Sequence, residues 1–135
     1  MFLDDIADYL TSGGAGTQGT DLFKGALPPA PDSAIALYET GGLGTVHTMG
    51  NVAGQAAVEQ PGLQVMSRAS SYQVARANAQ KAFLLLDGLP KRTINGVQYY
   101  WGAARQSPFL ATKDEQDRFL VAFNVDIIKD MSTTS

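Results

Sequence analysis

The 135-residue sequence contains no cysteine and a single histidine, His47. Without cysteine, the chain has no disulfide, no thiolate zinc site and no thiol nucleophile. No apolar run approaches the roughly 18 residues of a membrane-spanning helix. Residues 1–5 include two aspartates, the reverse of the basic start of a secretory signal. We therefore expect a soluble protein that is made and kept in a cytoplasm.

Charged residues are also scarce, at 17% of the chain and a net charge of −3. The average is about 25%, so the low fraction indicates a surface that is partly covered by a partner. An acidic balance argues against a basic nucleic-acid-binding domain. The charge is uneven, since residues 1–60 sum to −6 and residues 61–135 to +3. This asymmetry is typical of opposite faces that attract neighbouring copies, or it is scatter over a solvated surface.

Two helices are predicted from apolar periodicity. The first covers residues 3–10, where apolar residues recur at spacings of three and four. The second begins at Ser70 or Ser71, and it ends where Gly88 suits the position after the helix and Pro90 prevents continuation. Five residues lie on one face of this second helix: Tyr72, Ala75, Ala79, Ala82 and Leu86.

Strands account for most of the remaining order. Asn95-Gly96 predicts a type I′ hairpin turn, because both positions favour positive φ. The last strand alternates most clearly and is expected near the centre of the sheet. The prolines of residues 27–31 exclude a helix or a central strand there. The predicted strands are residues 21–25, 33–38 (broken by Glu39–Gly42), 63–68, 91–94, 97–104 and 118–128.

These elements predict an α+β fold, with a mostly antiparallel sheet and two main helices packed on one face. We expect one domain over residues 1–130 and a flexible tail over residues 131–135. Residues 41–60 are predicted to form a long glycine-rich loop, closed by Pro61-Gly62. Loops of this length inside compact domains are usually functional or mobile. The candidate interface residues of this loop are Gly41, Gly42, Leu43, Gly44, Thr45, Val46, His47, Met49 and Asn51.

The sequence contains no pattern that predicts catalysis. His47 is a weak candidate base, because no carboxylate lies beside it and no Gly-x-Ser-x-Gly elbow occurs. Residues 41–44 lack the spacing of a dinucleotide or phosphate loop. The carboxylates of residues 114–117 are interpreted as a solvated turn. We expect no catalytic, cofactor-binding or metal-binding residue and no cofactor.

An aromatic run, Tyr99-Tyr100-Trp101, lies on a predicted strand. Simple alternation places Tyr99 and Trp101 on one face and Tyr100 on the other. Few basic residues surround the run, so we interpret it as core on one side and subunit contact on the other. A platform on which nucleic-acid bases stack is the disfavoured alternative.

Several segments together resemble a known family. The most specific is Ala36-Leu37-Tyr38-Glu39-Thr40-Gly41-Gly42, and the resemblance extends to about Lys129. The other segments are residues 3–10, 19–25, 31–35, 61–65, 71–72 and 106–109, followed by 114–115. The sequence resembles small tailed-bacteriophage proteins called minor capsid proteins, and it is similar in layout to the tail terminator (tail completion) proteins of long-tailed phages.

The resemblance implies a structural virion protein that forms a hexameric ring, caps the tail tube and joins it to the head connector. It implies four kinds of partner: further copies of the chain, the tail tube protein, head–tail connector or stopper proteins, and genomic DNA in transit. The expected location is the neck of a virion assembled in the cytoplasm of a bacterial host. A head-completion or stopper protein, or another minor capsid protein, is the alternative. A small enzyme or ligand-binding domain is less favoured.

Overall fold

The computed structural model describes residues 2–46 and 58–130, with backbone only for residues 43–46. Within these ranges, two α-helices accompany a seven-stranded sheet, which confirms the predicted α+β class. The strand order is β1-β2-β3-β7-β5-β4, and β6 lies beside β7. All pairings are antiparallel except the one between β1 and β2. The strands are β1 (Leu22–Lys24), β2 (Ala34–Val46), β3 (Val58–Ala69), β4 (Arg92–Ile94), β5 (Val97–Ala104), β6 (Phe109–Lys113) and β7 (Phe119–Asp130).

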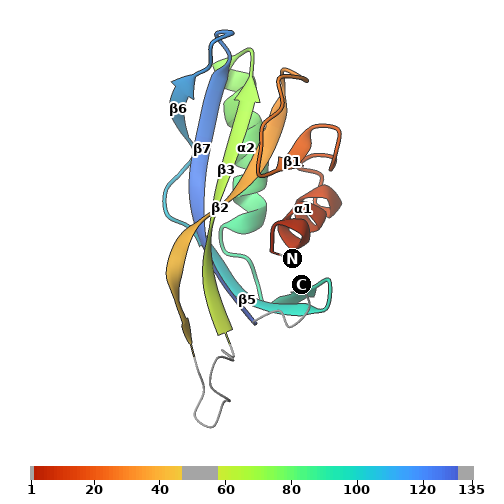
Figure 1. Cartoon of the computed structure of the whole chain (residues 1–135), viewed down its shortest axis with the longest axis vertical. Helices are drawn as coiled ribbons and strands as arrows, with labels where there is room; N and C mark the ends of the chain where they lie inside the picture. Colours follow the sequence, from red (N-terminus) through yellow and green to blue (C-terminus); the bar gives the residue numbers. More distant parts are fainter. Residues whose placement is uncertain (1, 47–57, 131–135) are drawn as a thin grey trace.

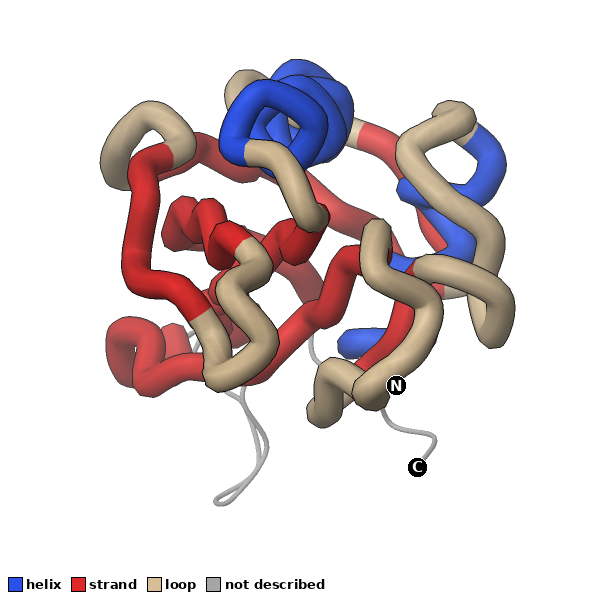
Figure 2. Tube along the Cα trace, turned by 90° about the horizontal axis from the view of Figure 1, so that it is seen from above, coloured by secondary structure: helices blue, strands red, loops and turns tan. Residues whose placement is uncertain are grey.

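Both helices contribute to one core on the same face of the curled sheet (Figure 2). Helix α1 spans Phe2–Ser12, and its buried side chains include Ile6 and Leu10. Helix α2 spans Tyr72–Leu86 and packs against β3 and β7. Figure 1 shows β2, β3 and β7 in front, with α2 behind them. The opposite face of the sheet carries no described helix.

The ends of α2 lie close to their predicted positions. The helix starts after Ser71, although the Ser71 side chain makes no capping hydrogen bond. At the other end, the Asp87 N–H bonds to the carbonyl of Phe83, and Gly88 adopts φ +74° as expected after a helix. Of the predicted inner face, the three alanines and Leu86 are fully buried. Tyr72 remains 40% exposed.

Strand β7 is central, as its alternation predicted. It pairs with β3 along one edge, and with β5 and β6 along the other. Phe123 is fully buried near its middle and makes an edge-to-face contact with Phe83, with ring centroids 5.6 Å apart. The β4–β5 turn is also confirmed, since Asn95 and Gly96 adopt φ values of 50° and 79°. Alternation and turn chemistry therefore fix the centre of the sheet and its β4 edge.

The predicted break at Glu39–Gly42 and the predicted loop over residues 41–60 are wrong at both ends. Strand β2 continues to Val46 and β3 already begins at Val58, so that Pro61-Gly62 lie within β3. Two register shifts, between Thr40 and Leu43 and between Leu43 and Val46, absorb the glycine-rich sequence. The glycines therefore introduce irregular pairing instead of ending the strand.

Strand β6 was not predicted. All five of its residues are exposed, so it has no alternation between apolar and polar positions by which to identify it. It pairs with the first half of β7, along the same edge that pairs with β5 further on. A register shift between Leu110 and Thr112 interrupts the pairing.

Candidate interaction surfaces

The arms of the β2–β3 hairpin approach closely where two glycines face the partner strand. A Cβ added to Gly42 would overlap the carbonyl oxygen of Gln60, and one added to Gly62 would overlap the Thr40 hydroxyl. At residue 42 only glycine allows this approach, because the overlap there is with backbone. The paired arms continue beyond the level of both helices (Figure 1). The hairpin is therefore a narrow projection attached to the sheet.

A buried lysine lies at the base of this projection. The Lys129 side chain is 2% exposed, and its Nζ donates to Oε1 of Glu59. The ammonium also lies 6.0 Å from the ring centroid of Phe2 and 5.9 Å from that of Tyr99. A buried ammonium needs such a partner, because desolvation disfavours the charged form. The pair joins the start of β3 to the end of β7 beside α1.

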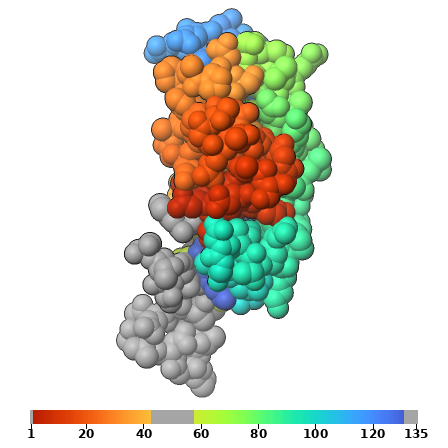
Figure 3. Space-filling model, turned by 90° about the vertical axis from the view of Figure 1, so that its right-hand side faces the viewer, coloured from red at the N-terminus to blue at the C-terminus, as the bar shows by residue number. Residues whose placement is uncertain are grey.

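A polar network fastens α1 to the β4–β5 hairpin, and the two lie side by side in Figure 3 (red and teal). The Tyr99 hydroxyl donates to Oδ2 of Asp5 over 2.9 Å, where both side chains are buried. Asn95 Nδ2 donates to Asp5 Oδ1 at 3.0 Å and to Asp8 Oδ2 at 2.7 Å. Burial, followed by the nearby Asp5 charge, raises the pKa of Tyr99. Hydrogen bonds from Asn95 and then Gln18 lower the pKa of Asp8.

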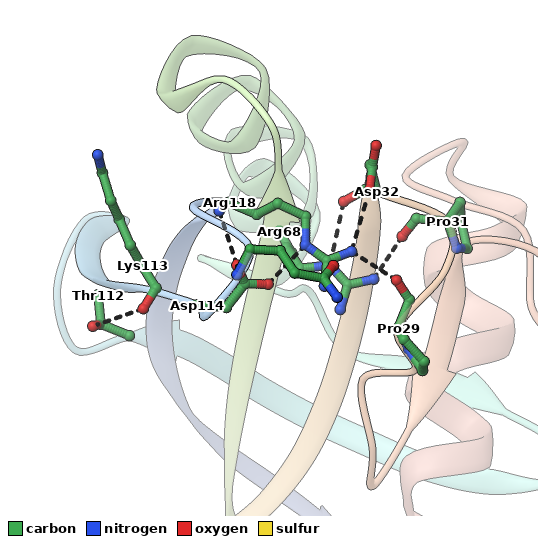
Figure 4. A network of polar contacts seen from close by, with 9 residues as sticks. Pro29, Pro31, Asp32, Arg68, Thr112, Lys113, Asp114 and Arg118 are labelled. Carbon is green, nitrogen blue, oxygen red and sulfur yellow. Dashed lines mark hydrogen bonds and ion pairs between the residues drawn. The ribbon is translucent and has the colours of Figure 1, made fainter.

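Two buried arginines meet on the helix-free face of the sheet (Figure 4). Arg118 Nε donates to Oδ2 of Asp114 over 2.7 Å, and the Arg118 N–H donates to its Oδ1 over 2.8 Å. Arg118 Nη1 donates to the carbonyl oxygen of Pro29 at 2.7 Å and to Asp32 Oδ1 at 3.2 Å. Burial tends to raise the pKa of Asp114, but hydrogen bonds from Arg118 and Gln116 hold it below the usual value.

Arg68 lies beside Arg118 and binds backbone instead of a carboxylate. Its Nη2 donates to the carbonyl oxygen of Pro31 over 2.6 Å, and its Nε donates to that of Asp32 over 3.3 Å. Burial, and then the charge of Arg118, lower the pKa of Arg68. The two arginines thereby hold residues 29–32, for which the prolines exclude a strand pairing, against the sheet.

A cavity of about 420 Å³ opens beside these arginines on the helix-free face. Burial there raises the pKa of Tyr38. A second cavity, of about 310 Å³, lies between the loop after α1 and the middle of α2 and includes Asp21, Asn78 and Lys81. Neither cavity combines a nucleophile with a hydrogen-bonded base. The first cavity is lined by Leu27, Pro29, Tyr38, Met66, Arg68, Asp114, Glu115, Gln116, Arg118 and Leu120.

The predicted orientation of the aromatic run is wrong. Tyr99 is fully buried, whereas Trp101 is 45% exposed. A register shift between these two residues adds one residue to β5 relative to β7, so that Gly102 is the next buried position. Tyr99 therefore belongs to the core, and Tyr100 and Trp101 are exposed.

Most acidic residues of the first half have partners within the same chain. Lys24 pairs with Asp4, and Asp21 accepts from the Thr17 N–H at 2.6 Å. The other four partnered acids are Asp5, Asp8, Asp32 and Glu59. Within the described ranges only Glu39 of this half has no such partner. Asp4, Asp32 and Glu59 are thus ion-paired within the chain, whereas Asp5, Asp8 and Asp21 accept hydrogen bonds from neutral donors and keep their charge.

The candidate interface residues divide into two groups. Residues 41–46 belong to β2, while His47, Met49 and Asn51 lie outside the described residues. Of the three turn carboxylates, Asp114 is a hydrogen-bonded anchor, and Asp117 lies 3.4 Å from Lys113. Sequence reasoning missed Arg68 and Arg118, because a lone arginine in a strand carries no signal that it is buried.

The part of the chain that the structure describes contains no cluster of three residues able to hold a metal ion. Its helices are too short or too polar to cross a membrane. The fold and its surfaces define a small α+β protein with a projecting hairpin and a sheet covered on one face. The family model described as bacteriophage tail terminator protein matches residues 9–131. The chain belongs to this family and is a structural protein of a phage particle.

Two solved structures share the fold. One is described as the virion of a native gene transfer agent particle; it is 16% identical, with 90% of this chain and 84% of that chain covered and a TM-score of 0.53. A second is 12% identical, with 99% and 93% covered and a TM-score of 0.56. No curated protein matches the sequence. At these identities the two structures establish the fold alone.

Proposed function

We propose that this protein terminates the phage tail, forming a hexameric ring that caps the tail tube and joins it to the head connector. Family membership over residues 9–131 carries the proposal. A ring requires two different patches on each copy. The projecting hairpin and the helix-free face of the sheet are two distinct surfaces for such contacts. This role requires no catalytic group and no cofactor.

The hairpin is the proposed contact with the tail tube or with a neighbouring subunit. Its candidate residues run from Gly41 to Asn51, on and beyond the end of β2. The described arms are held together by Gly42 and Gly62 and anchored by Lys129 and Glu59. Such an anchored projection can transmit a contact to the sheet. Genomic DNA is proposed to pass through the ring in transit, after assembly in the host cytoplasm.

A phage from which the gene has been deleted tests this function. Negative-stain microscopy is expected to show overlong tails and heads without tails. Supplying the intact gene in trans should restore normal tail length. Tails of normal length beside unjoined heads would contradict the proposal and favour a head-completion or stopper protein.

A second experiment tests the hairpin alone. Deleting residues 43–54 is expected to leave the purified monomer with cooperative melting, because the core lies in the remainder of the chain. The same variant should fail to restore tail length in the deletion phage. Full complementation by this variant would exclude the hairpin as the essential contact.

A further inference from the structure

The sheet is covered by helices on one face and carries a cavity on the other. The helix-free face includes Tyr38 of β2, Met66 of β3 and Leu120 of β7, all half-buried around the 420 Å³ cavity. Phe109 on the neighbouring β6 is exposed and pairs with Ala122 on this face. The wall of this cavity therefore combines an apolar part with charged and polar side chains.

An unpaired acid lies at the rim of this cavity. Glu115 is exposed and has no hydrogen bond or ion pair within the described ranges, whereas Asp114 beside it is bonded to Arg118. Both arginines that line the cavity already bind Asp114, Asp32 or backbone carbonyls. Of the two acids that line the cavity, Glu115 is therefore the one without a partner in the described part of the chain. An occupant that combines an apolar side chain with a nearby cation would complement it.

The outward side of α2 has this combination. Leu84 is 69% exposed, the highest value among the large apolar side chains of the described residues, and Val74 is 45% exposed. Lys81 lies one turn before Leu84, so the two side chains share one side of the helix. The helix contains no acidic residue, and no hydrogen bond or ion pair of Lys81 occurs within the described ranges.

We propose that α2 of one copy docks on the helix-free face of the next copy, with Leu84 at the cavity and Lys81 paired with Glu115. The contact would cover the open sheet face with a helix from a neighbour, as helices cover both faces in many sheets. The inference rests on the proposed ring. It goes beyond that proposal by naming the two surfaces that meet between neighbouring copies.

The arrangement of these surfaces fits a ring. Helix α2 covers one face of the sheet (Figure 1), and the cavity opens on the other face, so the contact is heterologous and can repeat from copy to copy. Two copies that packed α2 against α2 would instead form a closed dimer and bring the Lys81 charges together. Charge complementarity therefore favours the head-to-tail contact.

The absence of cysteine allows a direct test in purified phage particles. A phage that carries both Leu84→Cys and Gln116→Cys is treated with a short thiol cross-linker. Denaturing gels are expected to show a ladder from monomer to a full ring. Particles that carry only one substitution should give monomer. Particles assembled from a mixture of the two single variants should stop at dimers.

Each other result has a definite meaning. Dimers from Leu84→Cys alone would overturn the inference in favour of a helix–helix contact. A double variant that is present in the neck but gives only monomer would also overturn it, while leaving the proposed function intact. Absence of the intact protein from the particles would instead refute the proposed function.

A charge reversal provides a second measurement. Lys81→Glu would place two acids together and is expected to lower the yield of infectious particles about tenfold. Adding Glu115→Lys in the same chain should restore most of the yield. Lys91→Glu on the β4 side is the matched control and should have little effect. Failure of the double reversal to recover any yield, with both single variants folded, would contradict the pairing.

Discussion

The hydroxyl of Tyr99 and the carboxylate of Asp5 form a buried hydrogen bond of 2.9 Å across 94 positions of sequence. It joins the only buried aromatic residue of β5 to the first turn of α1. Asn95 donates to the other oxygen of the same carboxylate. Asp5 is therefore part of the folded core, with both carboxylate oxygens hydrogen-bonded within the chain.

Replacing Tyr99 by Phe tests this relationship. The variant keeps the ring and its packing but leaves an Asp5 oxygen buried without this donor, which should cost about 1–3 kcal/mol. The measurement is the free energy of unfolding in urea at neutral pH. Tyr100→Phe is the matched control, because the Tyr100 hydroxyl bonds to Asp130 at an exposed site. Its cost should stay within about 0.5 kcal/mol, and equal costs for both variants would contradict the assignment.

A second prediction concerns the aromatic contact between Phe83 of α2 and Phe123 of β7. Phe123→Ala removes a fully buried ring that contacts Phe83, so it should destabilise the fold by roughly 3–5 kcal/mol. Leu84→Ala on the outer side of α2 should change the stability of the monomer by less than about 0.5 kcal/mol. Thermal and urea unfolding of both variants provide the measurement. A loss below about 1 kcal/mol for Phe123→Ala would show that the ring is not part of the core.

Local sequence predicted those elements in which local chemistry and tertiary packing agree. Apolar residues on one side predicted α1, and strict alternation predicted that β7 is central. Asn95-Gly96 predicted its hairpin because few other residue pairs adopt two positive φ angles in succession. In each case the pattern that indicates the local structure also creates the face that the core buries.

The missed features depend on contacts distant in sequence. Glycines at 41 and 42 are typical of a strand end, but pairing with β3 and two register shifts keep β2 continuous. The shift beside Tyr99 depends on pairing with β7, and alternation within β5 alone does not indicate it. From the sequence, Arg68 and Arg118 are expected at the surface. They are buried because residues 29–32 pack over them in the folded chain. The helix-free cavity could not be predicted for the same reason.

The close approach of β2 and β3 gives a prediction with an adjacent control. Gly42→Ala places a methyl group against the carbonyl of Gln60, so the strands must separate at a cost of about 1–3 kcal/mol. A Cβ on Gly41 meets no atom within 4 Å, so Gly41→Ala should be close to neutral. Unfolding free energies of the two variants provide the comparison. Equal effects would show that the hairpin tolerates wider spacing.

The last prediction concerns acid sensitivity at the arginine cluster. The hydrogen bonds from Arg118 and Gln116 hold the folded-state pKa of Asp114 below its ordinary value of 3.8. A depressed carboxyl pKa contributes stability that is present above the unfolded pKa and is lost as the pH falls through the folded pKa. Asp114→Asn should therefore lower stability at pH 7, and its difference from the parent should shrink below about pH 4.

The neighbouring residue supplies the control for this pH dependence. Glu115 occupies the same turn without an ion pair in the described chain, so Glu115→Gln in the isolated monomer should change stability at pH 7 by less than about 0.5 kcal/mol. Unfolding midpoints for the parent and Asp114→Asn from pH 7 to pH 2, and for Glu115→Gln at pH 7, provide the test. A constant difference between the parent and Asp114→Asn at every pH would mean that the carboxylate charge does not stabilise the turn. In that case Arg118 would hold residues 29–32 through the Pro29 carbonyl and the Asp32 carboxylate alone.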